Sequence, residues 1–122
     1  MCTQIHFTQQ KNRIDRESQL KNLRDRVAIV TGGARGIGFA ICKELRKEGA
    51  SVILADSGTS IDGKGSEPGL ASDAAEVIGA VPFSDKLDGD SAKHLVDLAI
   101  KNFGSIDIVV NNAAIIRDAF IF

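Results

Sequence analysis

The chain has 122 residues, of which 43% are hydrophobic, with a net charge of −1 and two cysteines. This length and hydrophobic content suit one globular domain, and the near-neutral charge gives no reason to expect nucleic acid or an acidic membrane as a partner. Two cysteines are too few for a disulfide framework, and no apolar run approaches the length of a membrane span, so we expect a cytoplasmic protein.

Residues 1–22 are polar and mixed in charge, and only a weak helical pattern of apolar residues runs through them. Asp15 and Glu17 argue against a transit peptide, because such peptides are poor in acidic residues. We expect this segment to be a disordered extension and the folded domain to begin at residue 23.

From Val27 onward, short apolar runs alternate with helical patterns. Buried strands are predicted at VAIVT (27–31), SVILAD (51–56), AVPF (80–83) and IDIVVN (106–111). Helices are predicted from the glycines at 32–38 to about Gly49, through LASDAAEVI (70–78), and from a cap at Asp88 or Asp90 to about Phe103, before Gly104.

This alternation predicts an α/β fold, a Rossmann-like doubly wound parallel sheet that is truncated after the fourth strand. In the usual doubly wound arrangement the strand order is 3-2-1-4. Pro82 lacks an N–H group and is tolerated only where one side of a strand is unpaired, which predicts that its strand lies at an edge. The two arguments agree.

Four glycines lie within seven residues between the first strand and the first helix, in the sequence TGGARGIG (31–38). Such a loop lets the backbone approach a pyrophosphate, while the N-terminus of the helix offers N–H groups and a positive dipole end. The last glycine, Gly38, lets the helix pack close to the sheet. The alternative is a glycine-rich turn without a ligand, because short glycine motifs give many false positives.

Asp56 ends the second strand, where a carboxylate can accept both ribose hydroxyls of an adenosine. Its alternative role is that of a turn or cap aspartate. A carboxylate at this place repels a 2′-phosphate, which favours NAD over NADP. Arg35 in the glycine loop acts in the other direction if it pairs with that phosphate, and it can equally be a solvated loop charge.

These residues resemble the short-chain dehydrogenases/reductases over about Leu23 to Phe122. LRDRVAIVTGGARGIG (23–38) resembles the opening strand and cofactor loop of the family, and IDIVVNNAA (106–114) resembles its N-N-A-G stretch, with Ala114 in place of the glycine. The resemblance implies that residues 23–122 form a partial NAD(P)-binding Rossmann domain. It also implies an oxidoreductase that transfers a hydride between nicotinamide and a hydroxyl or carbonyl substrate.

The resemblance also implies roles for single residues. Asp85 lies at the spacing of an aspartate placed against the adenine amino group, Asn112 would contact the adenosine ribose, and Asn111 would help to fix the strand end. The cofactor-binding candidates are Thr31, Gly32, Arg35, Gly36, Ile37, Gly38, Asp56, Asp85, Asn111, Asn112 and Ala113.

Two further stretches resemble a sub-branch of the family, the 3-hydroxyacyl-CoA dehydrogenase and 3-oxoacyl reductase units. They are residues 56–78, with their long turn-rich loop after the second strand, and NNAAIIRDAFIF (111–122). A 3-hydroxyacyl thioester is therefore one substrate that the resemblance suggests.

The catalytic groups of the family are a serine and a Tyr-x-x-x-Lys pair, in which the tyrosine transfers the proton at the substrate carbonyl. The chain has no tyrosine, and the resemblance places these elements after Phe122. We therefore assign no catalytic residue and expect a fragment without the catalytic half, inactive alone.

The remaining polar candidates have simpler interpretations. His6 lies in the polar extension and His94 on a solvated helix face. Asp85, Asp88 and Asp90 lack the spacing of a calcium loop, so we expect a capped turn and no metal. Cys42 is expected to be a buried or half-buried bystander.

Two functional classes stay open. The first is a dehydrogenase/reductase of which this chain is the cofactor-binding half, acting on a small alcohol, ketone or acyl thioester and forming a homo-oligomer when complete. The second is a short protein that binds nucleotide, or pairs with another subunit, without chemistry. An in-frame Tyr-x-x-x-Lys downstream of Phe122 would favour the first.

Overall fold

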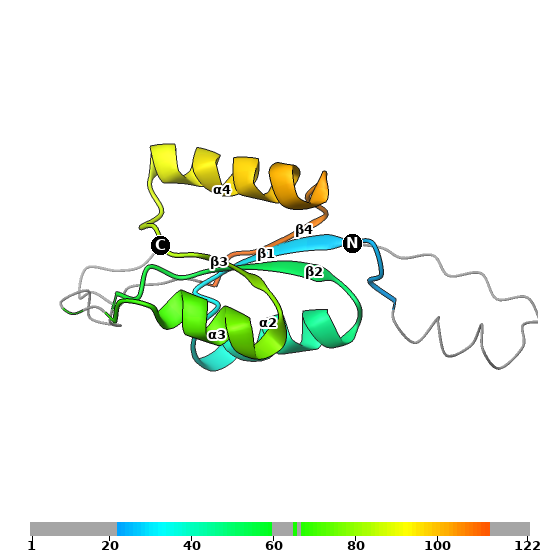
Figure 1. Cartoon of the computed structure of the whole chain (residues 1–122), viewed down its shortest axis with the longest axis horizontal. Helices are drawn as coiled ribbons and strands as arrows, with labels where there is room; N and C mark the ends of the chain where they lie inside the picture. Colours follow the sequence, from blue (N-terminus) through cyan, green and yellow to red (C-terminus); the bar gives the residue numbers. More distant parts are fainter. Residues whose placement is uncertain (1–21, 60–64, 66, 113–122) are drawn as a thin grey trace, which may run out of the picture.

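The protein forms a four-stranded parallel sheet with helices on both faces (Figure 1). The structure, a computed structural model, describes residues 22–59, 65 and 67–112. The strands are β1 (Val27–Thr31), β2 (Ser51–Ala55), β3 (Val81–Phe83) and β4 (Ile108–Val110), and the helices are α2 (Gly36–Lys47), α3 (Leu70–Ile78) and α4 (Gly89–Phe103). The strand order is β3-β2-β1-β4, so the predicted order 3-2-1-4 is confirmed. The predicted extension, except for Asn22, lies outside the described residues.

The sheet separates two apolar layers, because successive side chains of a strand point to opposite faces. On one face, Ala28 and Val30 of β1 and Val52 and Leu54 of β2 pack against α2 and α3. On the other face, Ile29 and its partner Ile53 pack with Leu95 and Ala99 of α4. All five residues of β1 are buried, as predicted for a central parallel strand.

The two edges of the sheet are β3 and β4. Pro82 lies in β3, which pairs with β2 alone, so the edge position predicted from this proline is confirmed. At the opposite edge, Val109 of β4 is 57% exposed although its register partner Ile29 is buried. The described residues thus leave one side of β4 without a strand and part of its apolar surface in water.

The ends of the helices follow the expected capping chemistry. Asp88 is the N-cap of α4: its carboxylate accepts hydrogen bonds from the N–H groups of Asp90 and Ser91, and the Ser91 hydroxyl accepts one from the N–H of Asp88. The bond from Ser91 lowers the pKa of Asp88 below its usual value. Gly104, in a left-handed conformation, ends α4. Within the described ranges, no helix combines the length and apolar character that a membrane span requires.

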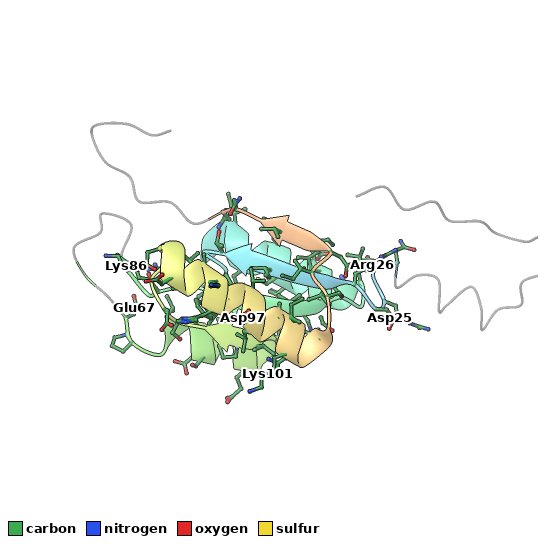
Figure 2. All side chains as sticks on the ribbon, turned by 90° about the horizontal axis from the view of Figure 1, so that it is seen from above. Asp25, Arg26, Glu67, Lys86, Asp97 and Lys101 are labelled. Atoms are coloured by element: carbon green, nitrogen blue, oxygen red, sulfur yellow. The ribbon has the colours of Figure 1, made fainter. Side chains whose placement is uncertain are left out.

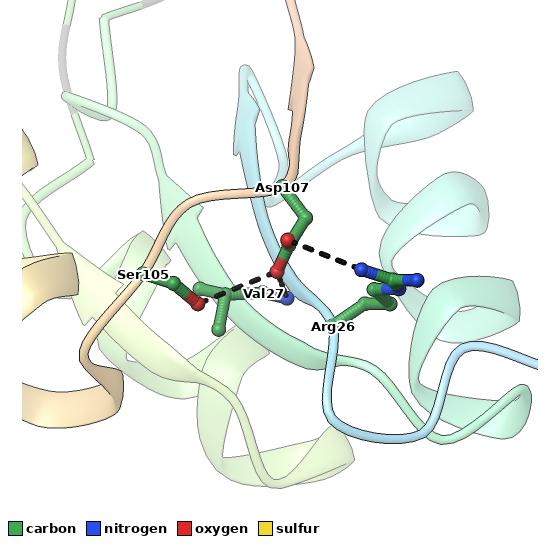
Figure 3. Close-up of polar contacts among 4 residues, drawn as sticks. All are labelled: Arg26, Val27, Ser105 and Asp107. Atoms are coloured by element: carbon green, nitrogen blue, oxygen red, sulfur yellow. Dashed lines mark hydrogen bonds and ion pairs between the residues drawn. The ribbon is translucent and has the colours of Figure 1, made fainter. Parts of the chain in front are cut away.

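A single carboxylate fixes the start of β4 to the start of β1 (Figure 3). The Asp107 Oδ2 atom accepts a hydrogen bond of 2.8 Å from the N–H of Val27, and the N–H of Asp107 donates one of 2.8 Å to the Val27 carbonyl. Ser105 donates to the same carboxylate at 3.4 Å, and Arg26 forms an ion pair with it at 3.6 Å. Asp107 thereby sets the register in which β4 joins the sheet.

We expect Asp107→Ala to lower the free energy of unfolding by about 1.5–3 kcal/mol, the usual contribution of a hydrogen bond to a charged group. Chemical denaturation of the two proteins measures this difference. Arg26→Ala is the matched control, because it removes only a partly exposed ion pair and should cost less than about 1 kcal/mol. Equal losses in the two variants would show that the ion pair, and not the bond to Val27, holds the strands together.

Candidate functional site

The carboxyl ends of β1, β2 and β4 lie side by side at one end of the sheet, which we call its carboxyl edge, to distinguish it from the outer strands β3 and β4. Thr31 is paired with Ala55 and Val30 with Val110, so the residues that follow these strands meet at this edge. Figure 2 shows the two ends of the sheet. Glu67 and Lys86 lie at the carboxyl ends of the strands, whereas Asp25 and Arg26, which precede β1, lie at the opposite end. In open α/β sheets, ligands bind outside the carboxyl ends of the strands.

The N-terminus of α2 at this edge suits an anion. Its N-cap residue, Arg35, makes no side-chain capping bond, and the first turn contains no acidic residue. The first N–H groups of a helix have no partner within the helix, and its dipole places positive charge there. Ile37 in the first turn is 74% exposed, which is unusual for a large apolar side chain and leaves it available for a ligand. This end of α2 has the features of a phosphate-binding helix start.

Gly38 allows α2 to approach the glycine loop at a distance that no other residue permits. A Cβ atom at this position would overlap the carbonyl oxygen of Gly32 and the side-chain amide of Asn112. The absence of a side chain therefore keeps loop, helix and the end of β4 in contact. The sequence predicted close packing of the helix on the sheet at Gly38, and the close approach in the structure is to the glycine loop and to Asn112 after β4.

Asn112 connects the end of β4 to the glycine loop. Its N–H donates to the Thr31 hydroxyl at 3.0 Å, and its side-chain amide donates to the Gly32 carbonyl at 3.2 Å. The Thr31 hydroxyl donates to the Val110 carbonyl at 3.4 Å. The resemblance implied that Asn111 would fix the strand end; the structure gives these contacts to Asn112, while Asn111 is exposed.

The Asp56 carboxylate joins two loops. Its Oδ2 atom accepts a hydrogen bond of 3.1 Å from the N–H of Ala34 in the glycine loop, and its Oδ1 atom accepts one of 2.9 Å from the N–H of Gly58. The alternative role of a turn aspartate is thus present in the structure. It does not exclude the ribose role, because a carboxylate has about four acceptor sites.

Arg35 is engaged with the segment after β2. Its Nη2 atom donates to the carbonyl of Thr59 at 2.6 Å, and the residue is half-buried. It therefore differs from the freely solvated loop charge considered from the sequence. The contacts of Ala34, Gly58 and Thr59 were not predicted from the sequence. The signal for the one at Gly58 was a glycine two residues after an aspartate, a pattern typical of a side-chain-stabilised turn.

The other candidates are placed as follows. Asp85 is exposed and lies two residues after Phe83, whose carbonyl accepts the N–H of Asp56 at 2.9 Å, so it belongs to the same edge of the sheet. Ala113, Ala114 and His6 lie outside the described residues. His94 is exposed on α4, as expected. Cys42 is completely buried, which confirms the burial expected for it, and this burial raises the pKa of its thiol to about 11.

A family model described as short chain dehydrogenase matches residues 26–121 of the chain. Among curated proteins, the peroxisomal multifunctional enzyme A of Dictyostelium discoideum is 39% identical over 100 residues, which cover 80% of this chain and 23% of that protein. The L-rhamnose 1-dehydrogenase (NAD(P)(+)) of Azotobacter vinelandii is 40% identical over 93 residues, which cover 75% of this chain and 36% of that protein.

The fold is also that of a solved structure, a short chain dehydrogenase from Bacillus anthracis. It matches with a TM-score of 0.65 and 24% sequence identity over 75% of this chain and 36% of the other. This likeness shows the fold alone. The chain thus spans between 23% and 36% of the length of these three proteins.

We expect Gly38→Ala to weaken the binding of a nicotinamide dinucleotide by at least about tenfold, because the added methyl group displaces the Gly32 carbonyl and the Asn112 amide. Calorimetric titration with NAD measures the loss, and thermal melting shows how much of it comes from unfolding. Gly89→Ala at the start of α4 is the matched control, because its Cβ meets nothing within 4 Å. Unchanged affinity in Gly38→Ala would remove the glycine loop from the site.

Proposed function

Since the chain belongs to the short chain dehydrogenase family, we propose that it supplies the dinucleotide-binding part of an NAD-dependent oxidoreductase. The reaction is hydride transfer between nicotinamide and a hydroxyl or carbonyl substrate. The observation that carries this proposal is the Asp56 carboxylate beside the uncapped start of α2, at the carboxyl edge of the sheet. The name of the Azotobacter relative includes NAD(P)(+), which supports the cofactor class.

In this proposal the chain's own residues hold the pyrophosphate at the start of α2. The backbone N–H groups from Gly36 to Gly38 face the phosphates, and their dipole offsets the negative charge. The absence of a side chain at Gly38 lets the loop lie against the helix, and Ile37 offers an apolar contact to the dinucleotide. Thr31, Gly32 and Asn112 hold the shape of this cradle through their mutual hydrogen bonds.

The adenosine half would lie along the ends of β2 and β3. Asp56 accepts the ribose hydroxyls with the acceptor sites that Ala34 and Gly58 leave free. Asp85 is placed after β3 for the adenine, and Asn111, Asn112 and Ala113 follow β4 on the other side of β1. NAD is favoured over NADP because a 2′-phosphate would meet the Asp56 charge.

A nicotinamide dinucleotide bound there would supply the hydride chemistry. The proton at the substrate oxygen needs a donor and acceptor of its own, and the sequence contains no tyrosine for this role. We therefore propose that these residues bind and orient the cofactor and do not themselves turn over substrate.

The substrate class rests on weaker support. The names of the relatives include a multifunctional peroxisomal enzyme and a dehydrogenase of L-rhamnose, so they do not select one compound. We propose a small alcohol or carbonyl compound, of which a 3-hydroxyacyl thioester is one. The homo-oligomeric state of the complete protein and the cytoplasmic location stay predictions.

The second candidate function is nucleotide binding or subunit pairing without chemistry. The lack of tyrosine favours it for these residues. Addition of the catalytic half of a related dehydrogenase as a separate chain distinguishes the two candidates, because only the first predicts NAD-dependent turnover in the mixture.

We expect the chain to bind NAD more tightly than NADP and Asp56→Ala to reduce this preference by about 1–3 kcal/mol, the scale of a hydrogen bond to a charged group. Calorimetry with both dinucleotides measures the preference. Asp97→Ala is the control for net charge, because Asp97 is exposed on α4 and should leave the preference unchanged (Figure 2). Tighter binding of NADP by the unmutated chain would mean that Asp56 does not decide the selectivity.

We also expect no dehydrogenase turnover by the 122-residue chain alone, because it lacks the tyrosine of the family's chemistry. The assay follows the formation of reduced nicotinamide cofactor from NAD by its absorbance, with hydroxyacyl thioesters and simple alcohols as substrates, after binding of NAD has been established. Turnover above that of the Gly38→Ala variant would contradict this expectation and require another proton donor in the chain.

A further inference from the structure

The segment that follows β2 is closed at its base by a backbone pair. Gly58 is buried, and its carbonyl accepts the N–H of Glu67 at 2.8 Å. Its φ of +79° lies in the left-handed region, and a Cβ at this position would overlap the carbonyl oxygen of Glu67. Only glycine satisfies both the backbone conformation and the close approach. Asp56 adds to this closure by accepting the N–H of Gly58.

This closed base positions the one basic side chain of the glycine loop. Thr59 directly follows Gly58, and its carbonyl accepts the 2.6 Å hydrogen bond from Arg35. Thr59 is itself held by the Ser57 hydroxyl, which accepts its N–H at 3.3 Å and lies 2.8 Å from its hydroxyl. The position of the Arg35 guanidinium therefore depends on the backbone of residues 57–59.

Resting on the proposed function, we propose that Gly58 and Glu67 are positioning residues for cofactor selectivity. The hydrogen bond from the Glu67 N–H to the Gly58 carbonyl fixes the position of the Thr59 carbonyl. This carbonyl binds Arg35 and so holds it away from the 2′-phosphate that distinguishes NADP from NAD.

The chemistry of the guanidinium explains why its retention matters. Arginine binds phosphate through two parallel hydrogen bonds, so a freely moving Arg35 would compensate the repulsion between a 2′-phosphate and Asp56. The Nη2 atom of Arg35 donates a short charge-assisted bond to the Thr59 carbonyl, and turning this atom toward the phosphate would break that bond. The charge of Asp56 and the binding of Arg35 to Thr59 thus both favour NAD over NADP. The Asp56 carboxylate takes part in both effects, because it also accepts the hydrogen bond from the Gly58 N–H.

Two variants open the base of the segment in different ways. Gly58→Ala introduces a methyl group against the Glu67 carbonyl. Glu67→Pro removes the N–H that donates to the Gly58 carbonyl and adds no side chain at residue 58. Gly69→Ala is the matched control: Gly69 has a φ of +83°, yet its Cβ would meet nothing within 4 Å. Arg35→Ala is combined with each loop variant and is also made alone.

The measured quantity is the ratio of the dissociation constants for NADP and NAD in calorimetric titrations of the full chain. We expect this ratio to shift toward NADP by about tenfold in Gly58→Ala and in Glu67→Pro, the effect of about one charge-assisted bond gained. Gly69→Ala and Arg35→Ala alone should leave the ratio unchanged. Addition of Arg35→Ala to either loop variant should abolish the shift, which a general loosening of the fold would not do.

Three results would overturn the proposal. An unchanged ratio in the loop variants that still melt cooperatively would show that the backbone pair does not control Arg35. A loss of NADP affinity relative to NAD in Arg35→Ala alone would show that Arg35 already reaches the phosphate; this variant leaves the loop backbone unchanged and decides the question even if the loop variants do not fold. An unmutated chain that binds neither dinucleotide would instead reject the proposed function, and this proposal with it.

Discussion

The hydrogen bonding of β1 to β2 on one side and to β4 on the other is the constraint on which the rest of the molecule depends. It is set at both ends of the strand: the Asp107 carboxylate binds the N–H of Val27 at the start, and Asn112 binds Thr31 and Gly32 at the end. Because parallel strands place their carboxyl ends at the same edge, this pairing brings the glycine loop between Asp56 and Asn112. A slip of β4 by one residue would remove both sets of bonds.

Asp56 shows how one side chain can serve the fold and the site together. It holds Ala34 in the loop before α2 and Gly58 in the segment after β2, so it preorganises two pieces of backbone that are distant in sequence. Each of its oxygens uses one acceptor site for this purpose and keeps capacity for another donor. A ligand hydroxyl would thus add to an existing network, and little reordering of the loops would be needed to bind it.

The two edges of the sheet carry different chemistry. At β3, Pro82 lacks an N–H group, and such an edge is a poor template for pairing with another strand. At β4, Val109 is exposed, and its neighbours Ile108 and Val110 are only partly buried. Apolar edges of this kind favour association with a further strand. The β4 edge is therefore the less protected of the two.

The sequence alone determined the elements and their order. Apolar runs of strand length, helical spacing, the glycine at 104 and the proline at 82 act locally, so α2, α3, α4 and the order 3-2-1-4 could be predicted. Asp56 and the glycine loop could be named as candidates for cofactor binding, whereas the bond that joins them was found only in the structure. Sequence reasoning left open whether Asp88 or Asp90 caps α4, because both can reach the first turn; the reciprocal bonds with Ser91 select Asp88. The partners of individual polar groups were decided only by the tertiary structure. Asn112 rather than Asn111 fixes the strand end, and Arg35 reaches Thr59, because these contacts join segments 24 to 80 residues apart, where a shift of about one residue changes which side chain faces the site.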